Sequence, residues 1–193
     1  MSRAEPAPGQ PARGTRAWYA RRRARVVTTS RMVEPTRFRE SFGRYFEDFE
    51  IGHVYEHRPK RTITQADNVW FTLLTMNTHP LHFDEEYGKK SEFGRCIVAS
   101  PLTVAILVGM SVTDVSHKAI ANLGWKEIRM THPVYPGDTL SAETQVVEKR
   151  ESRSRLGAGI VHVRTRGFNQ HQTLVCEFDR SILVPKRGHA IED

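Results

Sequence analysis

The sequence predicts an α+β domain in which a curved antiparallel sheet wraps around one long buried helix. Three observations lead to this fold. A helical segment that begins near Ser100 is apolar on nearly every side, as fully buried helices are. Strand-like segments follow it at 125–134, 140–147, 160–165 and 174–184. Only one extended segment and two short helices precede it, so we expect the later strands to cover the helix.

The N-terminal segment differs in composition from the rest of the chain. Residues 1–39 hold ten arginines and two acids, whereas residues 40–193 hold nineteen Lys/Arg and twenty Asp/Glu. Rich in Pro, Gly and Arg and without periodicity, residues 1–40 are predicted to be a disordered basic tail, although an organelle transit peptide has a similar composition. Because the remaining chain is near neutral, we expect no nucleic-acid partner. The longest apolar run, 104–110, is too short to span a membrane.

We expect one folded domain over residues 41–187 and a flexible C-terminus over 188–193. Near its start, residues 55–63 read as extended, and a helix follows with Thr64 as N-cap and Asp67 as the capping-box acid. We expect this helix to end before Pro80. Its apolar face is expected to hold Trp70, Leu73 and Leu74.

Two further helices are expected before the strands. The segment LHFDEEYGKK predicts a short helix that ends at Gly88. The buried helix is predicted to have Ser100 as N-cap and Pro101 at its first position. The turn PGDT at 136–139 then leads into a strand whose buried face alternates at Leu140, Ala142, Thr144 and Val146.

The two cysteines, Cys96 and Cys176, have no paired spacing. They support neither a disulfide framework nor a zinc ribbon, and we expect both to be small buried residues. A reducing compartment, and so a cytoplasmic location, fits this usage.

Three segments resemble the MaoC-type dehydratases of the hot-dog fold: TITQADNVWFTLLTMNTHPLHFDEEY, FGRCIVASPLTVAILVG and HPVYPGDTLSAET. The resemblance covers roughly residues 43–185. The first segment is similar to the hydratase signature, in which an aspartate and a histidine five residues apart bracket an Asn-Pro-Leu step. Its stretch TLLTMNTHPLHFD is similar to the branch that handles branched, dicarboxylic acyl-CoAs such as mesaconyl-CoA or itaconyl-CoA.

The resemblance implies a hydro-lyase: an acyl-CoA hydratase/dehydratase that adds water reversibly across the double bond of a short, branched or dicarboxylic enoyl-CoA. The coenzyme A thioester is then the substrate, and no other cofactor is implied. A homodimer or higher homo-oligomer is also implied, because pairing two hot-dog sheets covers their open edge strands.

The resemblance assigns the catalytic roles. His82 matches the signature histidine, and histidine side chains titrate near neutral pH, so His82 is expected to be the general acid/base. Asn77 stands where the signature has an aspartate; its amide can orient water but cannot accept a proton. His79 stands at the signature asparagine. The backbone N–H of Ser100, at the start of the buried helix, is expected to hold the thioester oxygen.

Residues near these positions are candidates for contacting the substrate: His79, Pro80, Phe83, Leu102, Arg95 and Arg129. The two arginines are expected to meet a substrate carboxylate or a coenzyme A phosphate. We expect no metal site, because Pro80 separates His79 from His82 and no HExxH-like helix frames them. Asp84 is expected to be structural at the start of the second helix.

Two alternatives remain open on the same fold. One is an acyl-CoA thioesterase, whose product is a free thiol. The other is a non-catalytic acyl-CoA-binding or regulatory protein, which the missing acid at Asn77 favours. Such a protein would gain thermal stability from thioester ligands without turnover.

Overall fold

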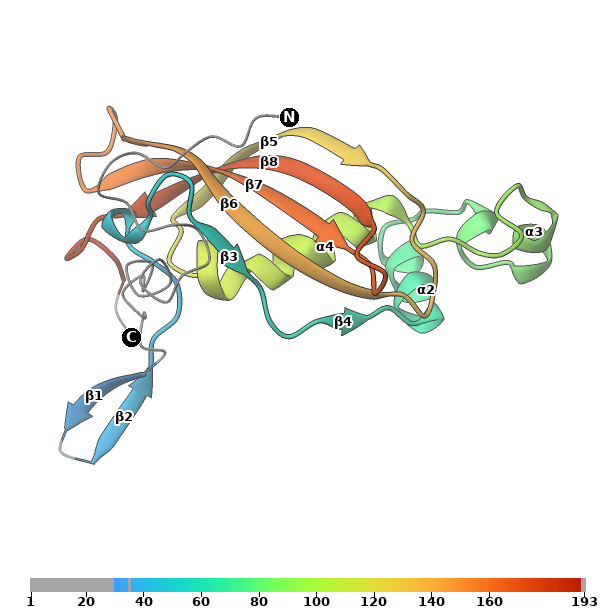
Figure 1. Cartoon of the computed structure of the whole chain (residues 1–193), viewed down its shortest axis with the longest axis horizontal. Helices are drawn as coiled ribbons and strands as arrows, with labels where there is room; N and C mark the ends of the chain where they lie inside the picture. Colours follow the sequence, from blue (N-terminus) through green and yellow to red (C-terminus); the bar gives the residue numbers. More distant parts are fainter. Residues whose placement is uncertain (1–29, 35, 192–193) are drawn as a thin grey trace, which may run out of the picture. The chain divides into compact units, whose positions relative to one another are not determined.

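The computed structural model describes residues 30–34 and 36–191, which fall into two units divided between Ser41 and Phe42 (Figure 1). In the first unit, β1 (Ser30–Glu34) and β2 (Arg37–Glu40) pair as an antiparallel hairpin. This differs from the disordered tail expected over residues 1–40. Residues 1–29 lie outside the described part of the chain.

The second unit contains the predicted helices and strands. Its elements are the 3₁₀ turn η1 (Phe46–Asp48), β3 (Val54–Glu56), β4 (Arg61–Thr62), α2 (Gln65–Leu74), the 3₁₀ turn η2 (Pro80–His82), α3 (Glu85–Lys90), α4 (Ser100–Ser111), the π-turn η3 (Val112–Ser116), β5 (Ala121–Met130), β6 (Thr139–Glu151), β7 (Ala158–Phe168) and β8 (Leu174–Pro185).

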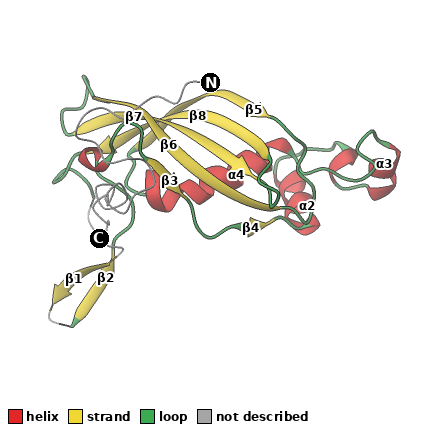
Figure 2. Ribbon diagram, in the orientation of Figure 1, coloured by secondary structure: helices red, strands yellow, loops and turns green. Residues whose placement is uncertain are grey.

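One antiparallel sheet of six strands organises this unit. Its order is β3-β6-β7-β8-β5, and β4 also pairs with β6. The sheet curves around α4, which contacts β6 and β7, while α2 and α3 lie beyond one end of the sheet (Figures 1 and 2). The predicted α+β architecture, a curved sheet wrapped around a central helix, is confirmed.

The alternation predicted for β6 is also confirmed. The inward positions are buried, as expected for a strand with one face against a core: Leu140, Ala142, Thr144 and Val146. From α4, the fully buried Leu107 packs so tightly against β7 that a Cβ on Gly167 would lie 2.4 Å from its Cδ1. Only glycine permits this approach of helix to sheet.

The apolar face predicted for α2 points away from the core. Trp70, Leu73 and Leu74 are 66%, 67% and 80% exposed, so this face is not covered within the described part of the chain. The helix instead buries the polar side chains of Asn68 and Thr72. A different set of contacts, described below, therefore determines how α2 is oriented.

Two further expectations needed correction. Helix α4 is apolar all round, yet Ala105 and Gly109 are exposed, so only one side of it is covered within this unit. Gly88 lies inside α3 rather than ending it, because the chain near Cys96 passes too close for a side chain: an added Cβ would lie 2.6 Å from Cys96 N. None of the described helices is long and apolar enough to cross a membrane.

A buried polar network joins the segment after β3 to the turn that follows α4. The ring of His57 lies 3.2 Å (Nδ1) from Asp114 Oδ2 and 2.7 Å (Nε2) from Thr144 Oγ1. Thr144 in turn bonds Thr165 at 2.9 Å, and Arg44 donates to the Asp114 carbonyl oxygen at 2.6 Å. The hydrogen bond from His57 holds the pKa of Asp114 below its ordinary value. This network explains why polar residues occupy positions on the inner face of the sheet.

Both cysteines are buried and unpaired, as predicted. Burial raises the pKa of both thiols, that of Cys176 to about 11, so neither is a reactive thiolate at neutral pH.

Candidate active site

The first turn of α2 holds the segment that carries His82. Thr64 and Asp67 form the predicted capping box, with Thr64 Oγ1 accepting from Asp67 N at 3.2 Å. This box fixes where the helix begins. Gln65 and Asn68, which are three residues apart in the sequence, therefore lie on the same face of α2. Both side-chain amides donate to the carbonyl oxygen of His82, Gln65 at 3.0 Å and Asn68 at 2.7 Å.

Asn68 also reaches the start of α4. Its side chain is fully buried; Nδ2 donates to the carbonyl oxygen of Ile97 at 3.0 Å, and Oδ1 accepts from Ala99 N at 2.9 Å. One carboxamide therefore ties the His82 segment to the N-terminus of the central helix. Sequence reasoning missed this residue. Its signal was an asparagine inside a helix, where that residue is unfavourable unless its side chain has specific partners.

The ring of His82 is oriented by a backbone carbonyl. Its Nδ1 lies 3.0 Å from the carbonyl oxygen of Ile97, and the side chain is half-buried. Because a carbonyl oxygen only accepts hydrogen bonds, Nδ1 carries the hydrogen, and Nε2 of the neutral ring keeps its lone pair. Nε2 is therefore available as a proton acceptor, which is what a general base requires.

Asn77 shapes the loop ahead of His82. Its backbone N–H closes the end of α2 by donating to Thr72 O at 2.9 Å, after Met76 has turned into the left-handed region with φ 54°. Its Oδ1 accepts from the backbone N–H of His79 at 3.1 Å. The carboxamide nitrogen makes no hydrogen bond within the described residues, so it can donate to a water or a substrate.

His79 lies beside His82, with ring centroids 5.8 Å apart. It caps η2: its Nδ1 accepts from Leu81 N at 3.2 Å. In the neutral His79 ring the hydrogen is then on Nε2, so the two histidines are in opposite tautomers. His82 presents an acceptor, while His79 presents a donor.

The start of α4 differs by one residue from the prediction. Ala99, not Ser100, is the N-cap, and Ser100 is the first helical residue. The Ala99 side chain cannot cap, but its carbonyl oxygen accepts from Leu102 N at 2.9 Å and from Thr103 N at 3.2 Å. Pro101 has no N–H. The N–H of Ser100 therefore has no acceptor within the helix, which leaves it available for an anionic oxygen.

The other predicted contact residues make no hydrogen bond or ring contact with the His82 side chain in the described part of the chain. Phe83 is 41% exposed, and Leu102 is buried in the main apolar core. The guanidinium of Arg95 stacks 3.7 Å above the Tyr135 ring, and Arg129 forms an exposed ion pair of 2.6 Å with Glu127. Pro80 begins η2 and is half-buried, so it sits within the loop that carries His82.

Asp84 is the N-cap of α3, where its side chain accepts from Tyr87 N at 3.0 Å. This is the structural role expected for it. In the described part of the chain, no group of three or more His, Cys, Asp or Glu side chains is placed to hold a metal ion.

The chain is similar to known proteins in sequence and in fold. Residues 48–166 match the family described as MaoC like domain. Mesaconyl-CoA hydratase of Cereibacter sphaeroides is 35% identical over 77% of this chain, and the match covers 43% of that protein. The chain thus spans less than half the length of this curated relative.

Two solved structures share the fold. The monoamine oxidase regulatory protein from Archaeoglobus fulgidus matches with a TM-score of 0.67 at 34% identity, over 75% of this chain and 95% of that one. A Mycobacterium tuberculosis protein described as a double hot-dog fold matches with a TM-score of 0.70 at 22% identity, over 78% of this chain and 48% of that one. The second likeness concerns the fold alone.

The sheet around α4, with a histidine tied to the helix start, defines a hot-dog protein whose candidate site lies at the N-terminus of its central helix. The chain belongs to the MaoC-like domain family.

Proposed function

We propose that the protein is an enoyl-CoA hydratase/dehydratase of the MaoC type. The observation that carries this proposal is the double role of Asn68, which bonds both the His82 segment and Ala99 at the start of α4. One buried side chain thereby positions both the proposed base, His82, and the helix start whose Ser100 N–H would bind the oxyanion. Hydration of an α,β-unsaturated thioester requires both groups.

The proposed reaction begins with water near the Nε2 atom of His82. As the water oxygen bonds the β-carbon, Nε2 takes one of its protons, and the π electrons move toward the thioester oxygen. The Ser100 N–H stabilises the charge on that oxygen. When the electrons return, the α-carbon takes the proton from the imidazolium. One histidine then returns to its starting state, and dehydration is the reverse.

Asn77 and His79 have supporting roles in this proposal. The carboxamide nitrogen of Asn77 donates to the attacking water, while its oxygen keeps the His79 backbone in place. The Nε2–H of His79, next to the His82 ring, is a second donor toward substrate. The chemistry needs no cofactor beyond the coenzyme A thioester itself, because its demands are proton transfer and charge stabilisation.

We propose a short branched or dicarboxylic enoyl-CoA, of the mesaconyl-CoA or itaconyl-CoA type, as substrate. The mesaconyl-CoA hydratase relative supports this choice. The experiment is a panel of mesaconyl-CoA, itaconyl-CoA and crotonyl-CoA, followed by mass spectrometry. The expected product is the thioester with one added water; release of free coenzyme A would point to a thioesterase instead.

A second copy of the chain is the proposed partner. Strand β5 is an open edge in which nine of ten residues are exposed, and its apolar side chains include Leu123, Trp125 and Ile128. An exposed apolar edge strand favours pairing with another edge. A homodimer through β5 supplies that edge.

We also propose a cytoplasmic location, because a reducing compartment suits the two free cysteines.

A non-catalytic acyl-CoA-binding protein is the second candidate, because position 77 offers an amide and no carboxylate. In that case the panel would give no product, while the same thioesters would still raise the melting temperature.

A further inference from the structure

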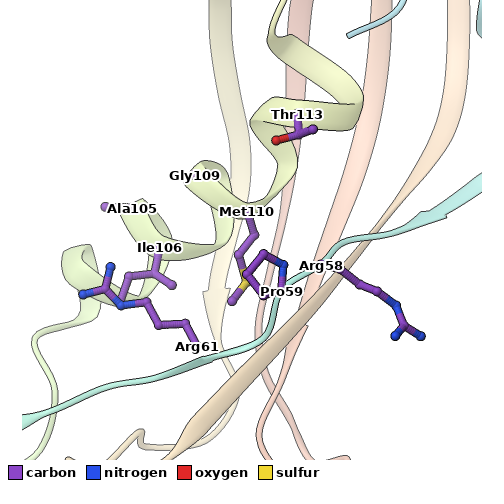
Figure 3. A pocket seen from close by; sticks show the side chains of 8 residues that line it. All are labelled: Arg58, Pro59, Arg61, Ala105, Ile106, Gly109, Met110 and Thr113. Carbon is purple, nitrogen blue, oxygen red and sulfur yellow. The ribbon is translucent and has the colours of Figure 1, made fainter. Parts of the chain in front are cut away.

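A pocket of about 380 Å³ lies along the exposed side of α4 (Figure 3). Its floor is α4 with the start of η3, and its wall is the chain that leads from β3 into β4. The lining residues are Arg58, Pro59, Arg61, Ala105, Ile106, Gly109, Met110 and Thr113. The floor is thus apolar and made largely of small residues, whereas the wall carries two cationic side chains.

The two arginines point in different directions. Arg61 extends along the pocket, and its guanidinium lies beside Ala105 and Ile106, near the middle of α4 (Figure 3). Arg58 is directed away from the helix (Figure 3). Only Arg61 therefore brings a positive charge to the side of the pocket that leads to the start of the helix.

Arg61 is held in this position by α2. Its Nη2 lies 2.6 Å from Asp67 Oδ1. Hydrogen bonds from Thr64 hold the pKa of Asp67 below its ordinary value, so the anchor stays charged at neutral pH. Asp67 uses one edge of the guanidinium, and the remaining N–H groups are available for a second carboxylate. The same turn of α2 positions Asn68, so Arg61 is attached to the structure that also orients His82.

The distance along the helix suits a short dicarboxylic acyl chain. Ala105 lies five residues after Ser100, which is about 7.5 Å along the helix axis. With the thioester oxygen at the Ser100 N–H, a carboxylate at the far end of a four-carbon chain comes within reach of an arginine side chain beside Ala105. The phosphates of coenzyme A lie beyond the pantetheine arm, away from the acyl group.

We propose that Arg61 binds the distal carboxylate of a dicarboxylic enoyl thioester and so determines the specificity of the site. The inference rests on the proposed function and adds the residue that selects the acyl group. Arg95 and Arg129, expected from the sequence to meet a carboxylate, are engaged with Tyr135 and Glu127 instead. The apolar floor at Ile106 and Met110 would accommodate a methyl branch.

A binding experiment tests this without turnover. Titration calorimetry would measure the affinity of wild type, Arg61→Met and Arg58→Met for methylsuccinyl-CoA and for 2-methylbutyryl-CoA. These saturated thioesters share a branched skeleton and differ in the distal carboxylate. Loss of a charge-assisted hydrogen bond predicts that Arg61→Met weakens methylsuccinyl-CoA binding by roughly 10- to 100-fold more than 2-methylbutyryl-CoA binding. Arg58→Met, the matched control, is expected to leave the ratio of the two affinities within about twofold.

Three results would overturn the inference. If Arg61→Met weakens the affinity for both ligands equally, the guanidinium binds the coenzyme A part of the ligand. If neither affinity changes, Arg61 does not contact the ligand. A wild type that binds neither ligand would also contradict it. Arg61→Lys, which keeps the charge, is expected to retain part of the preference, and thermal unfolding of each variant reports its folding. If wild type prefers methylsuccinyl-CoA yet hydrates no enoyl-CoA, the proposed function fails while the role of Arg61 in binding stands.

Discussion

The side chain of Asn68 donates a hydrogen bond of 2.7 Å to the carbonyl oxygen of His82, and its other end accepts from Ala99. One buried amide on α2 thus holds both the His82 loop and the start of α4. The distance between the His82 ring and the Ser100 N–H therefore depends on the Asn68 side chain.

Asn68→Ala tests that dependence. Removing the carboxamide leaves the buried Ala99 N–H without this acceptor, and an unsatisfied buried group costs about 1–3 kcal/mol. The carbonyl oxygens of His82 and Ile97 each lose one of two hydrogen bonds, because Gln65 and the His82 ring still donate to them. We expect the free energy of unfolding in urea to fall by about 2–4 kcal/mol, and kcat to fall more than KM rises. Gln65→Ala, which removes one bond to the same carbonyl, should show a smaller loss in both. Equal effects of the two substitutions would contradict the bridging role.

How far the sequence predicted this site depends on the range of the interactions. The cap at Thr64 and the strand alternation in β6 follow from neighbours in sequence, and both were predicted correctly. Asn68 was missed because its partners lie 14 to 31 residues away. The same limit explains α2: periodicity locates an apolar face at Trp70 and Leu73 but does not say whether anything within the chain covers it.

Asn77 offers a direct test of what an amide does at this position. In Asn77→Asp the carboxylate still accepts from the His79 N–H, so the loop should keep its form, and the new group can accept a proton from water. We expect kcat for hydration to rise in Asn77→Asp and to fall in Asn77→Ala, measured by steady-state kinetics at neutral pH. An Asn77→Asp enzyme less active than Asn77→Ala would show that the site needs the donor of the amide.

Asp114 predicts a pH dependence of stability. Its pKa is lowered from 3.8, chiefly by the hydrogen bond to His57. A carboxyl whose folded-state pKa is depressed stabilises the fold above its unfolded-state pKa, and this contribution is lost as pH falls through the folded-state pKa. With its side chain one-third exposed (33%), solvent screening limits the effect.

We therefore expect Asp114→Asn to lower the free energy of unfolding at pH 7 by about 1–2 kcal/mol. The difference from wild type should shrink as pH falls below the unfolded-state pKa and through the lowered folded-state pKa. Urea unfolding from neutral pH down to about pH 2 measures both. The exposed Glu148→Gln serves as the control and should differ little from wild type at any pH. A constant difference across this range would exclude the proposed link between Asp114 and acid stability.

The proposed dimer predicts an effect of charge on β5. Trp125 is 43% exposed on this edge strand. Trp125→Glu should shift the protein from dimer to monomer in light scattering coupled to size exclusion, because a charge would have to be buried in the interface. Leu156→Glu is a matched control, since Leu156 is 87% exposed and lies in the β6–β7 turn. Dimers that persist in Trp125→Glu would place the interface elsewhere.

The central claim is that Nε2 of His82 transfers the protons of hydration. The most direct measurement is kcat/KM for hydration of mesaconyl-CoA by wild type, His82→Ala and the control His171→Ala, whose side chain lies exposed in the β7–β8 turn. His82→Ala keeps the backbone carbonyl that Gln65 and Asn68 bind, so the loop should retain its position. A fall of about 10²- to 10⁴-fold in His82→Ala, with His171→Ala close to wild type, is the predicted result. Hydration by His82→Ala at the rate of His171→Ala would contradict the account.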